Sequence, residues 1–166
     1  YNNPHIITIM KEIALIGTNC RVFSDVLSVL LDRDIAVNAM VDYPEHVMLD
    51  DVLLTVSRMD FYNREAMREA FEGYHDAILT YDDDLKNAEH NDLTLKTFAD
   101  TVTAAREAGV ARVIVVGSPD SEAFFVTLLR RLDDIGWVFI STENDYPDRA
   151  VNELIEPSFH REVYAE

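Results

Sequence analysis

Short runs of Val, Ile and Leu alternate along this chain with longer segments in which apolar residues recur every three or four positions. The runs are typical of strands buried on both faces of a parallel sheet, and the longer segments are typical of helices with one buried stripe. The sequence therefore predicts an α/β fold, a doubly wound parallel sheet with helices on both faces. The expected strands are Glu12–Ile16, Ala36–Val41, Leu53–Ser57, Asp76–Thr80, Arg112–Val116 and Trp137–Ile140. The expected helices are Arg21–Leu31, Arg64–Phe71, Leu93–Ala108, Ser121–Asp134 and a short C-terminal helix from about Asp148 to Glu156.

Length and composition favour one domain over residues 1–166. The chain has 166 residues, of which 48% are hydrophobic, and it contains no internal repeat, low-complexity tract or flexible linker. Gly73, Gly109 and Gly136 follow the expected ends of three helices, where a residue in the left-handed conformation commonly closes the last turn. We expect all three glycines to have that role.

The turn after the first expected strand aligns with the glycine-rich sequence G-x-x-G-x-x-G of dinucleotide-binding proteins. In that turn the first glycine allows the bend, the second lets the backbone approach the pyrophosphate, and the third lets helix and strand pack closely. This chain keeps Gly17 but has Cys20 and Phe23 at the other two positions. The cofactor site is therefore expected to be impaired, although the helix N-terminus and Arg21 still offer donors to a smaller anion. A scaffold that has lost its ligand and a scaffold that still binds one both remain open.

Four blocks of sequence resemble the atypical short-chain dehydrogenases, in particular the compact NAD(P)H-binding group that includes flavin-reductase-like and epimerase-like proteins. The blocks are "KEIALIG", "VNAMVDYPEH", "RMDFYNREAMREAFEGYHDAILTY" and "TFADTVTAAREAGVARVIVVGS". The resemblance implies a Rossmann-like domain, an NAD or NADP cofactor and oxidoreductase or epimerase-like chemistry. It also places Asp60 near the adenine and makes Asp42 the residue that selects between cofactors, where an acid favours NAD over NADP. The cofactor-binding residues that it implies are Gly17, Thr18, Asn19, Cys20, Arg21, Asp42, Asp60, Gly117 and Ser118.

Two departures from this family concern catalysis. No Tyr in the chain is followed by a Lys four residues later, so the usual proton-donating Tyr/Lys pair is absent. The C-terminal stretch "GWVFISTENDYPDRA" joins two blocks that normally lie far apart, so the substrate-facing segment is expected to be shortened. Ser118 and Ser121 follow the fifth strand, but we expect Ser121 to cap the next helix, with Glu122 in its first turn. The catalytic residues therefore stay unknown.

Other groups of reactive side chains carry weaker signals. Asp82, Asp83 and Asp84 follow the fourth strand, but their spacing matches no calcium loop and acidic runs are usually solvated, so we expect no metal. Cys20 lies beside Arg21 near a helix N-terminus, where a thiol can become reactive, although a small buried side chain is the simpler interpretation. The five histidines form no metal-ligand pair.

The charge and the single cysteine limit the partners and the compartment. Asp and Glu outnumber Lys and Arg by 31 to 14, and a net charge of -17 repels nucleic acid and anionic membranes. One cysteine fits a reducing, cytoplasmic setting, and no apolar run is long enough to cross a bilayer. A small-molecule nucleotide is the expected ligand, and a homo-oligomer stays open. The leading hypothesis is a divergent NAD(P)-binding oxidoreductase with weak or lost cofactor binding; the alternative is a non-catalytic binding or regulatory protein on the same scaffold.

Overall fold

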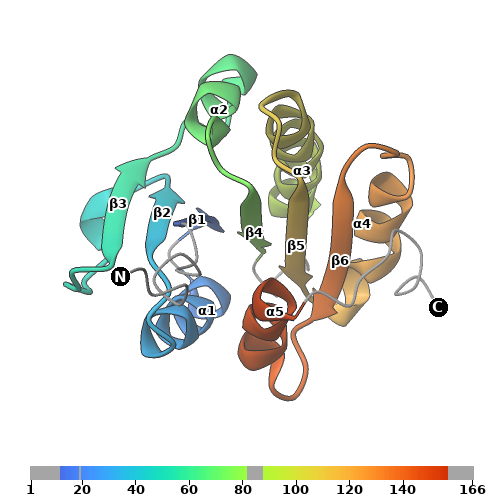
Figure 1. Ribbon diagram of the computed structural model, residues 1–166. Coiled ribbons are helices and arrows are strands. Elements are labelled where there is room, and N and C mark those ends of the chain that lie inside the picture. Colours follow the sequence, from blue (N-terminus) through green and yellow to red (C-terminus); the bar gives the residue numbers. More distant parts are fainter. Residues whose placement is uncertain (1–11, 19, 82–87, 157–166) are drawn as a thin grey trace, which may run out of the picture.

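The computed structural model describes residues 12–18, 20–81 and 88–156, and for residues 88–95 it describes the backbone alone. Six parallel strands form one sheet in the order β3-β2-β1-β4-β5-β6, which confirms the expected doubly wound Rossmann-like fold (Figure 1). The strands are β1 (Ile13–Gly17), β2 (Val37–Val41), β3 (Leu54–Arg58), β4 (Asp76–Thr80), β5 (Arg112–Gly117) and β6 (Gly136–Ser141).

Helices cover both faces of the sheet, as expected. The helices are α1 (Arg21–Asp32), α2 (Arg64–Phe71), α3 (Ala88–Glu107), α4 (Glu122–Leu129) and α5 (Tyr146–Ile155). Helices α1 and α5 lie side by side below the sheet in Figure 1, and α2, α3 and α4 lie on the opposite face. Two short 3₁₀ turns, η2 (Pro44–His46) and η3 (Pro119–Ser121), follow β2 and β5.

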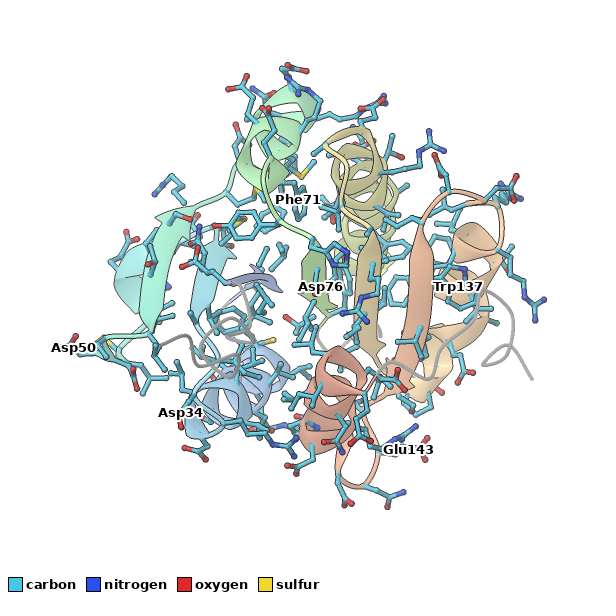
Figure 2. All side chains as sticks on the ribbon, in the orientation of Figure 1. Asp34, Asp50, Phe71, Asp76, Trp137 and Glu143 are labelled. Carbon is cyan, nitrogen blue, oxygen red and sulfur yellow. The ribbon has the colours of Figure 1, made fainter. Side chains whose placement is uncertain are left out.

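Alternation along each strand divides the buried residues between two cores. In β1, Ile13 and Leu15 pack toward α1 and α5, whereas Ala14 and Ile16 pack toward α2, α3 and α4. Figure 2 shows Phe71 and Trp137 between the sheet and the helices of the second face, with Asp34, Asp50 and Glu143 at the periphery. The strands read as continuous apolar runs because both faces of a parallel sheet are buried.

Three helix boundaries differ from the expected ones. Helix α3 begins earlier, at Ala88, and α5 begins at Tyr146 because Pro147 is well suited to a first helical turn. Helix α4 ends at Leu129 rather than Asp134. Its last turn tightens, since the amide of Leu132 donates to the carbonyl of Leu129 at 3.0 Å. A helix that continued to Asp134 would place Asp133 and Asp134 at the negative end of its dipole.

The expectation for the three glycines is right at two positions and wrong at one. Gly73 and Gly109 have φ values of 89° and 94°, as a left-handed helix end requires. Gly136 does not close a helix; it is the first residue of β6 and pairs with Arg112. At the end of α1 a non-glycine residue, Asp34, takes the left-handed conformation with a φ of 59°.

Candidate functional site

A cavity of about 520 Å³ opens at the carboxyl ends of the first four strands. Its wall consists of residues 16–18 after β1, 42–43 after β2, 58–62 after β3, 80–81 after β4, and Thr97 and Thr101 on α3. Strands β1 and β4 are neighbours although they are not consecutive, so the cavity lies where the strand order reverses. Open parallel sheets bind their ligands at this position.

Gly17 lines the cavity, and its neighbour Thr80 explains why glycine is needed there. The Thr80 hydroxyl donates a hydrogen bond to the carbonyl of Ile16 at 2.9 Å. A Cβ atom on Gly17 would lie 2.2 Å from the Thr80 oxygen and 3.3 Å from the ring of Phe23. Gly17 has no positive φ, so it is this close approach that requires glycine here.

The carboxylates of Asp42 and Asp60, which follow neighbouring strands, both line the cavity. Their expected roles toward a cofactor stay predictions. Asp42 follows β2, and one of its oxygens accepts the amide of Tyr43 at 3.0 Å. Asp60 follows β3, and one of its oxygens accepts the amide of Tyr62 at 3.0 Å. Each backbone bond engages one carboxylate oxygen, so the second oxygen of each residue is the natural acceptor for ligand hydroxyl or amine groups.

Arg58 brings a positive charge to the same wall. It is the last residue of β3 and pairs in register with Val41, which in turn pairs with Gly17. Its guanidinium carbon lies 5.9 Å from the centre of the Tyr43 ring, a cation–π contact. The rim at β2 and β3 therefore combines two acids, one base and exposed aromatic rings.

Tyr81 closes the cavity on the side of α3. Its ring centre lies 5.4 Å from that of Phe98 and 5.0 Å from that of Phe125. Burial raises the pKa of Tyr81 far above its usual range, and a hydrogen bond with Thr101 only partly offsets this effect. Tyr81 is therefore a neutral, firmly packed hydrogen-bonding group in the wall.

Cys20, Arg21 and Phe23 of the expected glycine turn are not among the residues of the cavity wall. Cys20 is half-buried at the N-terminus of α1, where it makes no side-chain cap hydrogen bond. Arg21 is largely exposed and forms an ion pair with Asp25 at 3.7 Å. Phe23 is 1% exposed and belongs to the core between the sheet, α1 and α5. Their expected roles toward a cofactor stay predictions.

The turn after β5 is also separate from the cavity wall. A Cβ on Gly117 would lie 2.9 Å from the ring of Phe125, so close helix packing requires glycine here. Ser118 is buried, and its carbonyl accepts the Ser121 hydroxyl at 2.9 Å. The expectation that Ser121 caps α4 is wrong, since its hydroxyl closes η3 instead and makes no cap hydrogen bond. Glu122 does lie in the first turn of α4.

Some expected residues fall outside the part of the chain that the structure describes. These are Asn19 of the turn and Asp82, Asp83 and Asp84 of the acidic run. Within the described ranges, no group of three or more His, Cys, Asp or Glu side chains is arranged to hold a metal ion. None of the described helices is long and apolar enough to cross a membrane.

The sequence interpretation missed Arg58, Tyr81, Thr97 and Thr101. A local signal exists for the first two, because each stands at the carboxyl end of a predicted strand, where ligand-binding residues gather. Thr97 and Thr101 are four residues apart on α3, so they lie on one face of that helix. Only the packing of α3 against the sheet places that face at the cavity.

Comparison with solved structures shows the same fold in several enzymes and enzyme candidates. A candidate epimerase from Bacteroides thetaiotaomicron is 22% identical with a TM-score of 0.77, and the match covers 91% of this chain and 94% of that one. The Citrobacter sp. triphenylmethane reductase complexed with NADP(H) is 19% identical with a TM-score of 0.58, and the match covers 79% of this chain and 49% of that one. The Escherichia coli NADPH-dependent quinone oxidoreductase complexed with NADPH is 18% identical with a TM-score of 0.61, and the match covers 78% of this chain and 48% of that one. The match thus spans about half the length of each of these two reductases.

Comparison of the sequence with known proteins identifies the family. No curated protein matches the chain. The model of the NAD(P)H-binding family matches residues 17–133, which begin at Gly17 and run through every segment of the cavity wall except Ile16. This match spans more than half of the chain. The protein therefore belongs to the NAD(P)H-binding family.

Proposed function

We propose that the protein binds a nicotinamide adenine dinucleotide with the adenosine end in the cavity, as a divergent NAD(P)-dependent oxidoreductase. The observation that carries this proposal is the convergence of Gly17, Thr18, Asp42 and Asp60 in one cavity. These residues follow three neighbouring strands of the first half of the sheet, which is a mononucleotide-binding half in doubly wound folds. Membership of the NAD(P)H-binding family supports the same ligand.

The two acids at the cavity favour NAD over NADP. Asp42 follows β2, where a carboxylate accepts hydrogen bonds from ribose hydroxyls and repels a 2′-phosphate. Arg58 in the same wall attracts that phosphate and therefore limits the preference. We expect affinity to be low, with a Kd on the order of 0.1 mM or weaker, because Cys20 replaces the glycine that lets backbone approach the pyrophosphate.

Calorimetric titration with NADH and NADPH tests the proposal. NADH should bind about tenfold more tightly than NADPH, and the difference should shrink in Asp42→Ala and grow in Arg58→Ala. Tighter binding of NADPH than NADH would contradict the assigned preference. Absence of binding by both at millimolar concentration would contradict the proposed function itself.

Asp60 has a matched control in the same protein. Asp51 makes the same local turn, since its side chain accepts the amide of Leu53 at 2.9 Å, but it does not line the cavity. Asp60→Ala should weaken NADH binding by about tenfold through the loss of a charged acceptor, and Asp51→Ala should leave it unchanged. Equal effects of the two substitutions would show that only the turn, and not the ligand, depends on Asp60.

A second candidate function is a non-catalytic nucleotide-binding or regulatory protein. The absence of a Tyr/Lys pair and the packed aromatic rings beside Tyr81 favour it. Oxidation of NADH, followed by absorbance with quinones and triphenylmethane dyes as acceptors, separates the two candidates. These acceptor classes are those named for the two reductases of similar fold. Turnover supports the oxidoreductase, whereas binding without turnover supports the regulatory protein.

A further inference from the structure

The cavity belongs to one half of the nucleotide-binding edge. Its wall comes from the carboxyl ends of β1, β2, β3 and β4 and from α3. Among the described residues, none from β5, β6, α4 or α5 contributes to it. A doubly wound sheet consists of two mononucleotide-binding halves, and a dinucleotide normally extends across both. In the part of the chain that the structure describes, the wall extends no further along the strand order than Tyr81, which follows β4.

Beyond Tyr81, aromatic side chains pack in the core between the sheet and the helices α3 and α4. We call Tyr81, Phe98, Phe125 and Phe139 the aromatic cluster. Phe125 is its centre, with ring centres at 4.4 Å from Phe98, 5.0 Å from Tyr81 and 5.9 Å from Phe139. Phe98, Phe125 and Phe139 are at most 5% exposed. The cluster joins β4, β6, α3 and α4, so it occupies the interior on the second half of the sheet.

Contacts at Gly117 show how tightly the cluster covers the end of β5. The Phe125 ring would lie only 2.9 Å from a Cβ at that position, so no ligand atom fits between the ring and the backbone. The carbonyl of Gly117 accepts the amide of Thr142 at 2.9 Å. The side of Gly117 where a Cβ would stand contacts Phe125, and the carbonyl of Gly117 is hydrogen-bonded to Thr142.

Tyr81 separates the cavity from the aromatic cluster because it belongs to both. Its ring contacts Phe98 and Phe125 on one side, and it forms part of the cavity wall on the other. Its amide donates to the carbonyl of Val116 at 2.9 Å, which fixes the backbone beside β5. Its hydroxyl bonds to Thr101 of α3. The backbone is thus held by β5, the ring by α3 and α4, and the hydroxyl by α3.

The chemistry of the open half suits an adenosine phosphate. Ile16, Met59 and Phe61 provide apolar surface for a base, and Asp60 provides an acceptor for an exocyclic amine. Arg58 supplies a cation in the same wall, and Gly17 and Thr18 lead to the N-terminus of α1, where phosphate groups are favoured.

We propose that the cavity recognises adenine mononucleotides, ADP in particular, and that the nicotinamide half of a dinucleotide adds nothing to binding. This inference rests on the adenosine site of the proposed function, and it favours the non-catalytic nucleotide-binding candidate, because hydride transfer needs a nicotinamide that is held in place. A dinucleotide then binds by its adenosine end, while its second half stays in solvent beside Tyr81. ADP and NADH consequently compete for one site with similar affinity.

Parallel titrations of the full chain with ADP, NADH and nicotinamide mononucleotide test this inference by calorimetry, without divalent cations. The Kd values of ADP and NADH should agree within about threefold, and nicotinamide mononucleotide should neither bind nor displace ADP. NADH binding more than threefold tighter than ADP, or displacement of ADP by nicotinamide mononucleotide, would overturn the inference and leave the proposed function standing. If neither ADP nor NADH binds, the proposed function fails and this inference fails with it.

Substitution of Tyr81 tests its role as the separating residue. In Tyr81→Ala, space opens toward the aromatic cluster. The affinity for NADH relative to that for ADP should therefore rise by more than about threefold. Phe124→Ala is the control: its ring centre lies 5.7 Å from that of Phe125, but it does not line the cavity, so the ratio should stay as in the unsubstituted chain. An unchanged ratio in a folded Tyr81→Ala chain would contradict the separating role. If that variant does not fold, the comparison of ADP with NADH on the unsubstituted chain still decides the inference.

Discussion

Gly17, Cys20 and Phe23 have three unrelated structural roles, although they stand at equivalent positions of one turn motif. Gly17 is required by the approach of the Thr80 hydroxyl. Cys20 precedes the first residue of α1 and is half-buried. Phe23 points into the core and contributes to the packing of α1 on the sheet. The Phe at this position therefore adds core volume, and it is not among the residues of the cavity wall.

Phe23→Ala should destabilise the protein without improving nucleotide binding. Removal of a ring that is 1% exposed leaves a cavity in the core, so the free energy of unfolding should fall by about 3–5 kcal/mol. Chemical denaturation measures this loss, and calorimetry with NADH measures binding. Cys20→Ala is the control and should cost less than about 1 kcal/mol, since the side chain is only half-buried. A gain in NADH affinity for Phe23→Ala would show that the ring obstructs the site.

The elements of the second half of the sheet are joined by the aromatic cluster. Helices α3 and α4 contribute Phe98 and Phe125, β6 contributes Phe139, and Tyr81 follows β4. Helix α4 has only eight residues, yet it buries Phe125, Val126 and Leu129. Its attachment to the sheet depends on these side chains, because its described N-terminus carries no side-chain cap.

Because Tyr81 is buried in the aromatic cluster, we expect the protein to lose stability at alkaline pH. The unfolded chain releases the Tyr81 proton near pH 10, whereas burial raises the pKa of this residue in the folded chain. The unfolded state thus binds fewer protons above about pH 10, so the stabilisation is complete below that pH and decreases above it, by up to about 1.4 kcal/mol per pH unit.

Urea unfolding of Tyr81→Phe at a series of pH values between about 9 and 11 measures the effect. The free energy of unfolding should fall less steeply with pH in Tyr81→Phe than in the unsubstituted chain. Tyr62→Phe is the control, because Tyr62 is 73% exposed, and it should keep the steeper fall. Identical slopes for all three proteins would contradict the burial of the Tyr81 hydroxyl.

At the scale of the whole molecule, a net charge of -17 opposes the compact state through repulsion between its surface carboxylates. Exposed ion pairs, such as Arg64 with Glu107 at 2.8 Å between α2 and α3, act in the opposite direction. Exposed pairs contribute little individually, and the chain has 31 acids for 14 bases, so repulsion should dominate.

Added salt should therefore stabilise the protein. The thermal unfolding midpoint should rise by a few degrees as NaCl increases from about 0.01 M to about 0.15 M, where the screening length shortens from about 30 Å to about 8 Å. Differential scanning calorimetry measures this change. KCl at the same concentrations should have the same effect if screening is the cause, and a falling midpoint would mean that attractive pairs outweigh the repulsion.

The sequence predicts most of the fold because the relevant signals are local. Alternation of apolar runs and amphipathic segments is sufficient for six parallel strands with helices on both faces. The error at Gly136 arises because a glycine after a helical pattern also fits the start of a strand. The pairing of Gly136 with Arg112 of β5 decides between them, and this contact is not local.

Part of the candidate site is equally visible in the sequence. The glycine motif predicts Gly17, and the family resemblance predicts Asp42 and Asp60. All three stand at or just after the end of a strand, and parallel strands bring their carboxyl ends to one edge. Ser121 was misassigned because a serine before a helix usually caps it, whereas here the Ser118 carbonyl is a nearer partner. Local sequence does not distinguish these two hydrogen bonds.

Order along the chain thus determined the strands, the helices and the edge of the sheet at which the cavity opens, because hydrophobic periodicity and residue identity act over a few neighbouring positions. The tertiary structure alone decided the extent of the cavity. Phe125 of α4 and Phe98 of α3 meet Tyr81 only after both helices pack on the sheet, and this packing fixes the position of Tyr81 in the cavity wall. Side-chain packing between distant segments depends on three-dimensional shape, which no local pattern of residues records.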